Sequence, residues 1–461
     1  MISLLYSDDR NPTASLRGEG DFLSDYFEGL SVLREVPQSW QRTFLDVLSH
    51  PLIHEDDILY RRGILTDFQA EPRLWEVLFD FAEETVRQRR EFSDRRRRMY
   101  SGTIHGSFSA EENRFYTTFL PLQEDCVEFC ALAVRARDLT DAMARLSPAS
   151  EGVRSFCAFV SRFSLSRPVV AEAADACHRL SETSITDFLR NSALTVTLVE
   201  DLRFAFSELS FCAAGGVGRT FFTDSVSEAG YRVACRRACE CVRNDLKRIL
   251  DAFYEPLDEL RRALEFYGAA MRLETAARGR GIPVSFPEFS RESFSVEVLY
   301  DLRLQSELNS SMLPRTASFS RECVLITGGN NAGKTVFLRS VILLHLLAQA
   351  GLFVFAQGAR IPLFSSLSIL FASEESCDSV GRFEAEVKAL AEIDRQGADV
   401  GDLVILNEIF QSALYRESEV VLGNILRAWT ERGCRWLAVT HLHLPIPENG
   451  AELHFSESFK L

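Results

Sequence analysis

The chain has 461 residues, which is too long for one hydrophobic core and predicts two or three domains. With 46 % hydrophobic and 25 % charged residues and no signal-peptide pattern at its start, it has the composition of a globular, cytoplasmic protein that does not enter a membrane. Its net charge of -15 excludes a surface that is positive throughout, although a local basic stripe can still bind nucleic acid.

Residues 1–110 are the first predicted segment, mixed in character and helical toward its end. Seven of the twelve residues from 87 to 98 are arginines, and clustered arginines can displace counterions from DNA. The candidate DNA-binding residues are Arg95, Arg96, Arg97 and Arg98. The alternative is a solvated helix face on which acidic neighbours balance the arginines.

Residues 111–280 are predicted to be almost wholly helical, because apolar residues recur every three or four positions, as in 127–146 and 233–264. Long helices need partners that cover their apolar stripe, so we expect an elongated bundle or arm. The glycine-rich stretch 213–219 predicts a turn between two helices. A nucleotide loop is disfavoured there because no strand precedes it.

The eleven cysteines are scattered, which favours free thiols over a disulfide framework. Cys126 with Cys130, and Cys235, Cys239 and Cys241, are spaced so that thiols can share a helix face. A zinc site is the alternative there, but small buried side chains suit the spacing better because no CxxC pair or suitably placed histidine accompanies them.

Residues 281–461 form the third predicted domain, in which strand-like segments alternate with helices, as is typical of a mostly parallel sheet covered on its faces. The sequence Gly328-x-x-x-x-Gly333-Lys334-Thr335 has the spacing of a phosphate-binding P-loop between an apolar strand and an apolar helix. Backbone N–H groups and the helix N-terminus would surround a phosphate, Lys334 would reach the β- and γ-phosphates, and Thr335 would bind Mg²⁺. The predicted nucleotide-binding residues are Gly328, Gly329, Asn330, Asn331, Ala332, Gly333, Lys334 and Thr335.

Two further strands are predicted to end beside this loop. The strand 403–406 ends in Asn407 and Glu408, where Glu408 would activate or orient the attacking water and Asn407 would meet Mg²⁺ through water. Asn407 lacks the charge of the aspartate usual at this position, so we expect weaker metal binding or slower turnover. The strand 436–440 leads to His441, which would contact the γ-phosphate or the water and so distinguish ATP from ADP.

These motifs resemble, in order, the ATPase domain of the MutS family of DNA mismatch-repair proteins. The matching segments are 327–335, 338–339, 351–354 with 359–364, 383–386, 406–409 and 438–441, and the helical region is similar to the family's core and lever arm. The resemblance implies an ABC-type ATPase that dimerises, with composite ATP sites and arms that embrace DNA. It transfers roles to Lys334, Thr335, Glu408 and His441, and it matches Glu386 to a family acid.

Three departures from the family pattern predict a short MutS-like ATPase. We expect no mismatch-reading domain before the helical region and none of the family's C-terminal helices after His441. After Glu408 the family runs Gly-Arg-Gly-Thr-Ser-Thr, whereas only Ser412 supplies a hydroxyl here, so the contact across the dimer is not implied.

The predicted fold is therefore α+β and multidomain, with a long helical core and lever arm before a C-terminal P-loop α/β ATPase domain. The predicted function is hydrolysis of ATP with Mg²⁺ to control helical arms that grip duplex, mismatched or branched DNA, in a homodimer, for repair or recombination. One alternative is a nucleotide-gated scaffold that hydrolyses ATP poorly. Another is an ABC-type ATPase whose arm binds protein.

Overall fold

The computed structural model divides the chain into two compact units. The first, the helical unit, comprises Met1–Leu4 and Thr66–Leu264, and the second, the sheet unit, comprises Leu5–Leu65 and Glu265–Leu461. The structure describes residues 3–7, 13–18, 23, 26–27, 36–103, 120–164, 225–291, 293–302, 315–319, 323–329, 332–372, 379–411, 415–448 and 450–455. The sheet unit thus includes residues 5–65 of the expected N-terminal segment, and the division at 1–110, 111–280 and 281–461 stays a prediction.

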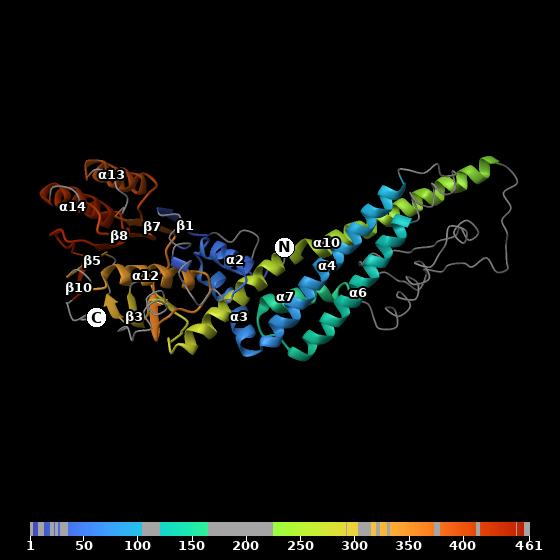
Figure 1. Ribbon diagram of the computed structural model, residues 1–461, viewed down its shortest axis with the longest axis horizontal. Helices are drawn as coiled ribbons and strands as arrows, with labels where there is room; N and C mark the ends of the chain where they lie inside the picture. The colour runs from blue at the N-terminus through green and yellow to red at the C-terminus, as the bar shows by residue number, and fades with distance from the viewer. Residues whose placement is uncertain are drawn as a thin grey trace. The chain divides into compact units, whose positions relative to one another are not determined.

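The helical unit is built from long helices that run side by side (Figure 1). They are α4 (Pro72–Thr103), α6 (Leu120–Leu146), α7 (Glu151–Ser161) and the first part of α10 (Ser225–Gly279). The glycine-rich turn expected at 213–219 lies outside the described residues. Among the described helices, none combines the length and the apolar character that crossing a membrane requires.

A buried group of charged and polar side chains joins three of these helices. Glu128 of α6, only 1 % exposed, accepts hydrogen bonds from Tyr254 of α10 (2.8 Å) and from Arg96 of α4. Asp125 accepts from Arg243 Nε (3.0 Å) and lies 3.0 Å from Arg96. Burial raises the pKa of Tyr254 to about 12, so its hydroxyl remains a donor. Because an unpaired buried charge is costly, these contacts fix how α4, α6 and α10 pack.

The main sheet of the sheet unit contains, in the described residues, six parallel strands in the order β1-β7-β8-β9-β5-β10. This confirms the predicted mostly parallel sheet and gives a mixed helix–sheet fold consistent with an α/β ATPase domain. Its strands are β1 (Ser15–Gly18), β5 (Cys323–Gly328), β7 (Ser366–Phe371), β8 (Asp402–Asn407), β9 (Arg435–Val439) and β10 (Gly450–Phe455).

A second, smaller sheet has the order β2-β6-β3-β4 and mixes parallel and antiparallel pairs. Its strands are β2 (Glu288–Phe289), β3 (Phe294–Leu299), β4 (Arg315–Phe319) and β6 (Gly358–Ile361). Residues 294–299, in the third predicted domain, form β3, which belongs to this sheet and not to the main one.

Helices cover both faces of the main sheet. Figure 1 shows α13 (Ser379–Arg395) and α14 (Tyr415–Glu431) on one side and α12 (Lys334–Gln349) on the other. Alternate residues of β8 and β9, such as Val404, Leu406, Trp436 and Ala438, pack in one cluster with α13 and α14. Because successive residues of a strand point to opposite faces of a sheet, the residues between these four point to the other face.

The N-terminal region contributes to this unit through the end of α12. Gln349, fully buried, donates to the carbonyls of Leu52 (2.7 Å) and Phe364 (3.0 Å) and accepts from the N–H of Phe364 (3.0 Å). The helices α2 (Gln38–Leu48) and α3 (Glu55–Ala70) flank Leu52 in the chain. One amide side chain thus links segments that are far apart in sequence.

The buried histidine of α12 predicts sensitivity to acid. Burial, with a smaller contribution from Arg435, lowers the pKa of His345 from 6.5 to about 3. Well above pH 6.5 the imidazole of His345 is neutral in both the folded and the unfolded chain. Below pH 6.5 the imidazole is protonated in the unfolded chain, whereas in the folded chain it stays neutral down to about pH 3. The free energy of unfolding should therefore fall by up to about 1.4 kcal/mol per pH unit as the pH drops toward 3.

His345→Leu should remove this contribution, so that urea unfolding followed from about pH 7 down to about pH 4.5 shows a shallower loss of stability than in the wild-type protein. Parallel stability curves for the two proteins would contradict the assignment.

Candidate functional site

The carboxyl ends of β5, β9 and β8 lie level at one edge of the main sheet. Val439 of β9 is paired with Ile326 of β5 on one side and with Asn407 of β8 on the other. The residues that follow each strand therefore emerge together. This register brings Lys334, Glu408 and His441 into one group.

Glu408 lies between the other two side chains. Its Oε1 is 3.9 Å from Lys334 Nζ and 3.3 Å from His441 Nε2. The Lys334 side chain is only 4 % exposed, and its ammonium also donates to the carbonyls of Gly328 (2.7 Å) and Gly329 (2.9 Å). His441 is exposed, so the group opens to solvent on the histidine side. An ammonium, a carboxylate and an imidazole are thus available to one ligand.

Two side-chain oxygens that could act as metal ligands lie beside this group. Thr335 Oγ1 donates to Asn407 Oδ1 over 3.1 Å. A hydroxyl and an amide oxygen at this separation suit a hard cation such as Mg²⁺, which binds oxygen and keeps several waters. Asn330 and Asn331 of the predicted loop, and Ser412, lie outside the described residues, while Ala332 is buried.

Glycine is required at both ends of the loop for reasons of backbone geometry. Gly328 has φ 141°, and a β-carbon there would clash with the carbonyl oxygen of Phe455 on β10. Gly333 precedes α12 with φ 82°. Both conformations are disfavoured for other residues. The closely approaching backbone at Gly328 is that of β10, a strand that the sequence did not predict.

The turn after β8 is strained at two non-glycine residues. Glu408 has φ 54° and Phe410 has φ 65°, conformations that cost a non-glycine residue roughly 1–2 kcal/mol each. Several contacts hold the turn in place. The N–H of Glu408 donates to Val439 O (2.8 Å), and the N–H of Phe410 donates to the buried carboxylate of Glu386 (2.7 Å).

Sequence reasoning missed one contact to the central carboxylate. Gln411 Nε2 donates to Glu408 Oε2 over 2.6 Å, so both carboxylate oxygens have a neighbour. No sequence signal marked Gln411, because its contact depends on the unusual turn. His443, two residues after His441, donates its main-chain N–H to Glu419 of α14 (2.9 Å).

Comparison with known proteins bears on the same region. The family described as MutS domain V matches residues 324–455, which include β8, β9, β10 and all of β5 after its first residue, Cys323. The DNA mismatch repair protein MutS of Thermus thermophilus is 32 % identical over 136 residues, 29 % of this chain and 17 % of that protein. This region of the chain is MutS-like.

Further relatives extend the match. The endonuclease MutS2 of Gemmatimonas aurantiaca is 27 % identical over 283 residues, 58 % of the MutS-like chain and 34 % of that protein. The mitochondrial DNA mismatch repair protein MSH1 of Arabidopsis thaliana is 32 % identical over 120 residues, 26 % of the chain and 11 % of that protein. The MutS-like chain thus spans between about a tenth and about a third of the length of these curated relatives.

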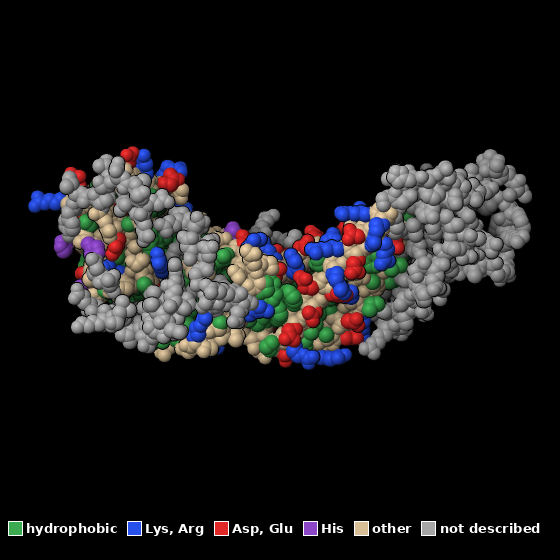
Figure 2. All heavy atoms as spheres, viewed as in Figure 1, with side chains coloured by type: hydrophobic (Ala, Val, Ile, Leu, Met, Phe, Trp, Pro, Cys, Tyr) green, Lys and Arg blue, Asp and Glu red, His purple; other side chains and the backbone are tan. Residues whose placement is uncertain are grey.

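In the helical unit, the arginines predicted to bind DNA have acidic or carbonyl neighbours. Arg95 lies 3.5 Å from Glu124, Arg97 lies 4.0 Å from Asp94, and Arg98 donates to the carbonyl of Asp94. Arg96 belongs to the buried group around Glu128 described above. On the face drawn in Figure 2, basic and acidic side chains alternate over this unit. The contacts fit the alternative of a charge-balanced helix face better than a basic stripe.

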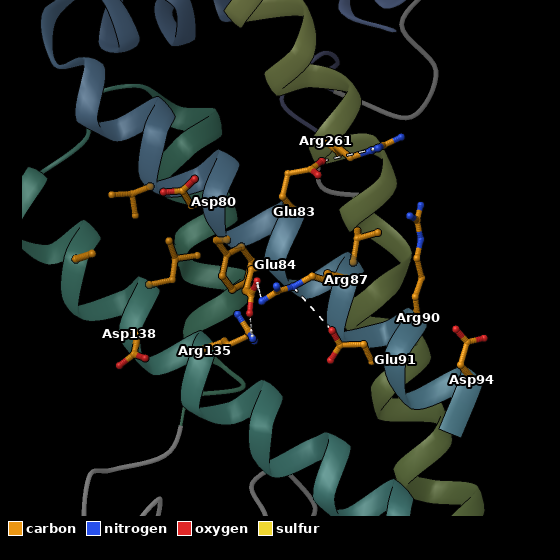
Figure 3. A pocket seen from close by; sticks show the side chains of 15 residues that line it. Asp80, Glu83, Glu84, Arg87, Arg90, Glu91, Asp94, Arg135, Asp138 and Arg261 are labelled. Carbon is orange, nitrogen blue, oxygen red and sulfur yellow. Dashed lines mark hydrogen bonds and ion pairs between the residues drawn. The ribbon is translucent and has the colours of Figure 1, made fainter. Parts of the chain in front are cut away.

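A groove of about 890 Å³ in the helical unit has the same mixed character (Figure 3). Glu84 binds Arg135 (2.6 Å) and Arg87, and Arg261 lies 3.7 Å from Glu83. The charged residues that line the groove are Asp80, Glu83, Glu84, Arg87, Arg90, Glu91, Asp94, Arg135, Asp138 and Arg261. Its acids outnumber its arginines, which disfavours a polyanion there.

Arg96 and Arg97 should contribute very differently to the free energy of unfolding. Removing one partner of a buried ion pair costs about 3–5 kcal/mol, so Arg96→Ala should strongly lower the free energy of unfolding of the MutS-like chain. Arg97 is 81 % exposed, and Arg97→Ala should change it by no more than about 0.5 kcal/mol. Urea unfolding of both variants tests this, and equal destabilisation would contradict a structural role for Arg96.

Proposed function

We propose that this MutS-like chain binds ATP at the carboxyl edge of the main sheet and hydrolyses it. The observation that supports this most directly is the meeting of Lys334, Glu408 and His441 at three neighbouring strand ends. Lys334 begins α12, so the positive end of that helix and the ammonium act on the same anion.

In the proposed reaction a water oxygen attacks the γ-phosphorus, and the bond from phosphorus to the β–γ bridging oxygen breaks. Glu408 accepts the proton of the water, a role typically worth about 10²- to 10⁴-fold in rate. Lys334 stabilises the negative charge on the phosphate oxygens. His441, whose Nε2 lies 3.3 Å from the same carboxylate, contacts the γ-phosphate or the water in this proposal and so distinguishes ATP from ADP.

Thr335 and, through water, Asn407 would hold Mg²⁺, which supplies charge neutralisation for the phosphates when it is bound. Gly328, Gly329, Ala332 and Gly333, with Asn330 and Asn331 between them, would surround the phosphates with backbone N–H groups. The neutral amide of Asn407 favours a weakly held metal.

For the whole protein, we propose a cytoplasmic homodimer that joins through its ATPase domain and uses ATP to control how its helices hold duplex, mismatched or branched DNA during repair or recombination. The names of the relatives, DNA mismatch repair proteins and a MutS2 endonuclease, support this proposal. The balanced charges around Arg95–Arg98 direct the search for the DNA-binding surface to other residues.

A second candidate is a nucleotide-gated scaffold that binds ATP and hydrolyses it poorly, favoured by the uncharged Asn407. The mixed-charge helical unit also suits an ABC-type ATPase whose arm binds protein.

Steady-state ATP hydrolysis separates enzyme from scaffold. Lys334→Ala should abolish ATP binding, while Glu408→Gln should keep binding and lower kcat by about 10²-fold or more. Lys388→Ala is the matched control, because Lys388 is 74 % exposed and pairs with Glu384 on α13. Turnover that survives both site changes would reject this site, and wild-type turnover equal to that of Glu408→Gln would favour the scaffold.

Binding of homoduplex, mismatched and branched DNA, with and without ATP, tests the proposed partner. Contacts to the DNA backbone should weaken as salt rises, by about 10³-fold or more between roughly 50 and 200 mM salt for six or more phosphates. Electrophoretic shifts across this salt series measure it. If none of the DNAs binds at low salt, the protein-binding arm becomes the better account.

A further inference from the structure

We propose that Glu386 is a positioning residue that orients Glu408 for catalysis by fixing the main chain of the turn after β8. The inference rests on the proposed function, in which Glu408 accepts a proton from water. In this role Glu386 acts on the main chain of the turn, through the N–H of Phe410, and takes no part in the reaction itself.

The contact is buried and directional. Glu386, on α13, is 4 % exposed, and its Oε2 accepts the N–H of Phe410 over 2.7 Å. A charged acceptor shortens and strengthens such a bond, and little water is present to compete for the N–H group. The bond acts two residues beyond Glu408, within the same turn.

The side chain of the anchored residue is held by the same helix. The ring of Phe410, itself 1 % exposed, packs against the ring of Phe383 with centroids 4.9 Å apart. Phe383 and Glu386 are three residues apart and so lie on one face of α13. One helix face thus holds both the ring and the N–H group of Phe410.

The bond from the Phe410 N–H to Glu386 maintains a strained conformation of the turn, which we expect to relax without it. Glu408 and Phe410 both have positive φ, and such residues persist only where their surroundings over-determine them. Gln411, the next residue, donates to Glu408 Oε2, so the position of the carboxylate depends on the whole turn. Without the acceptor on α13, we expect Phe410 to relax and Glu408 to move away from Lys334 and His441.

The test uses the whole 461-residue chain and separates the length of the side chain at position 386 from its charge. Glu386→Gln keeps an oxygen at the same distance and should retain kcat within about threefold, whereas Glu386→Asp keeps the charge, withdraws the acceptor and should lower kcat by about tenfold. Glu386→Ala should lower kcat by about 10- to 100-fold with ATP affinity nearly unchanged. Glu384→Ala, at an exposed acid of the same helix, is the control.

A double-mutant cycle shows whether Glu386 acts through Glu408. In the Glu408→Gln background, Glu386→Ala should have almost no further effect on kcat. Hydrogen exchange should meanwhile report faster exchange in peptides that contain the Phe410 amide for Glu386→Ala and Glu386→Asp, but not for Glu384→Ala.

Several results would overturn the inference. Among them are an equal loss of kcat in both backgrounds, a loss of ATP affinity that parallels the loss of kcat, and wild-type kcat in Glu386→Asp. Unchanged exchange at Phe410 would do so independently of turnover. If the wild-type protein does not hydrolyse ATP, or Glu408→Gln is as fast as wild type, the proposed function fails first and the inference fails with it.

Discussion

The parallel register of β8, β9 and β5 is the constraint on which the candidate site depends. Because each strand pairs level with the next, the residues after Asn407, Val439 and Gly328 emerge at one edge, within reach of a single ligand. A shift of one residue in any of the three strands would turn its side chains to the opposite face and separate the group. The apolar contacts that α13 and α14 make with alternate strand residues are what hold this register.

The sequence predicted this part of the fold because its signals are local. The strands at 403–406 and 436–440 are short apolar runs that end in polar residues, and the P-loop spacing stands between a strand and a helix. The edge strands carried no such signal. Ser15–Gly18 pairs with β7, whose residues lie at the other end of the chain, and Gly450–Phe455 is only partly apolar. Pairing between distant segments depends on the assembled sheet, which no local pattern contains.

The same distinction explains the charged residues. The run 87–98 displays its arginines plainly, but the buried carboxylate partners of Arg96, which are Asp125 and Glu128, are on another helix. The spacing of residues in the sequence indicates the charge of one helix face. It does not indicate the charge of the side chains that pack against that face. Glu386 is a comparable case, since a family resemblance marked the position, while its bond to Phe410 follows from the fold of the turn.

The pairing of β1 with β7 has a practical consequence for dissecting the molecule. A fragment that starts after α10 would hold every residue of the proposed nucleotide site, yet it would leave one side of β7 without its neighbour and Gln349 without the carbonyl of Leu52. Exposed strand edges recruit other chains, and a buried amide that loses a partner is destabilising. Excision of the matched family segment alone should thus yield an aggregation-prone polypeptide. Co-expression with the N-terminal stretch is the rational route to a minimal folded unit that contains the proposed nucleotide site.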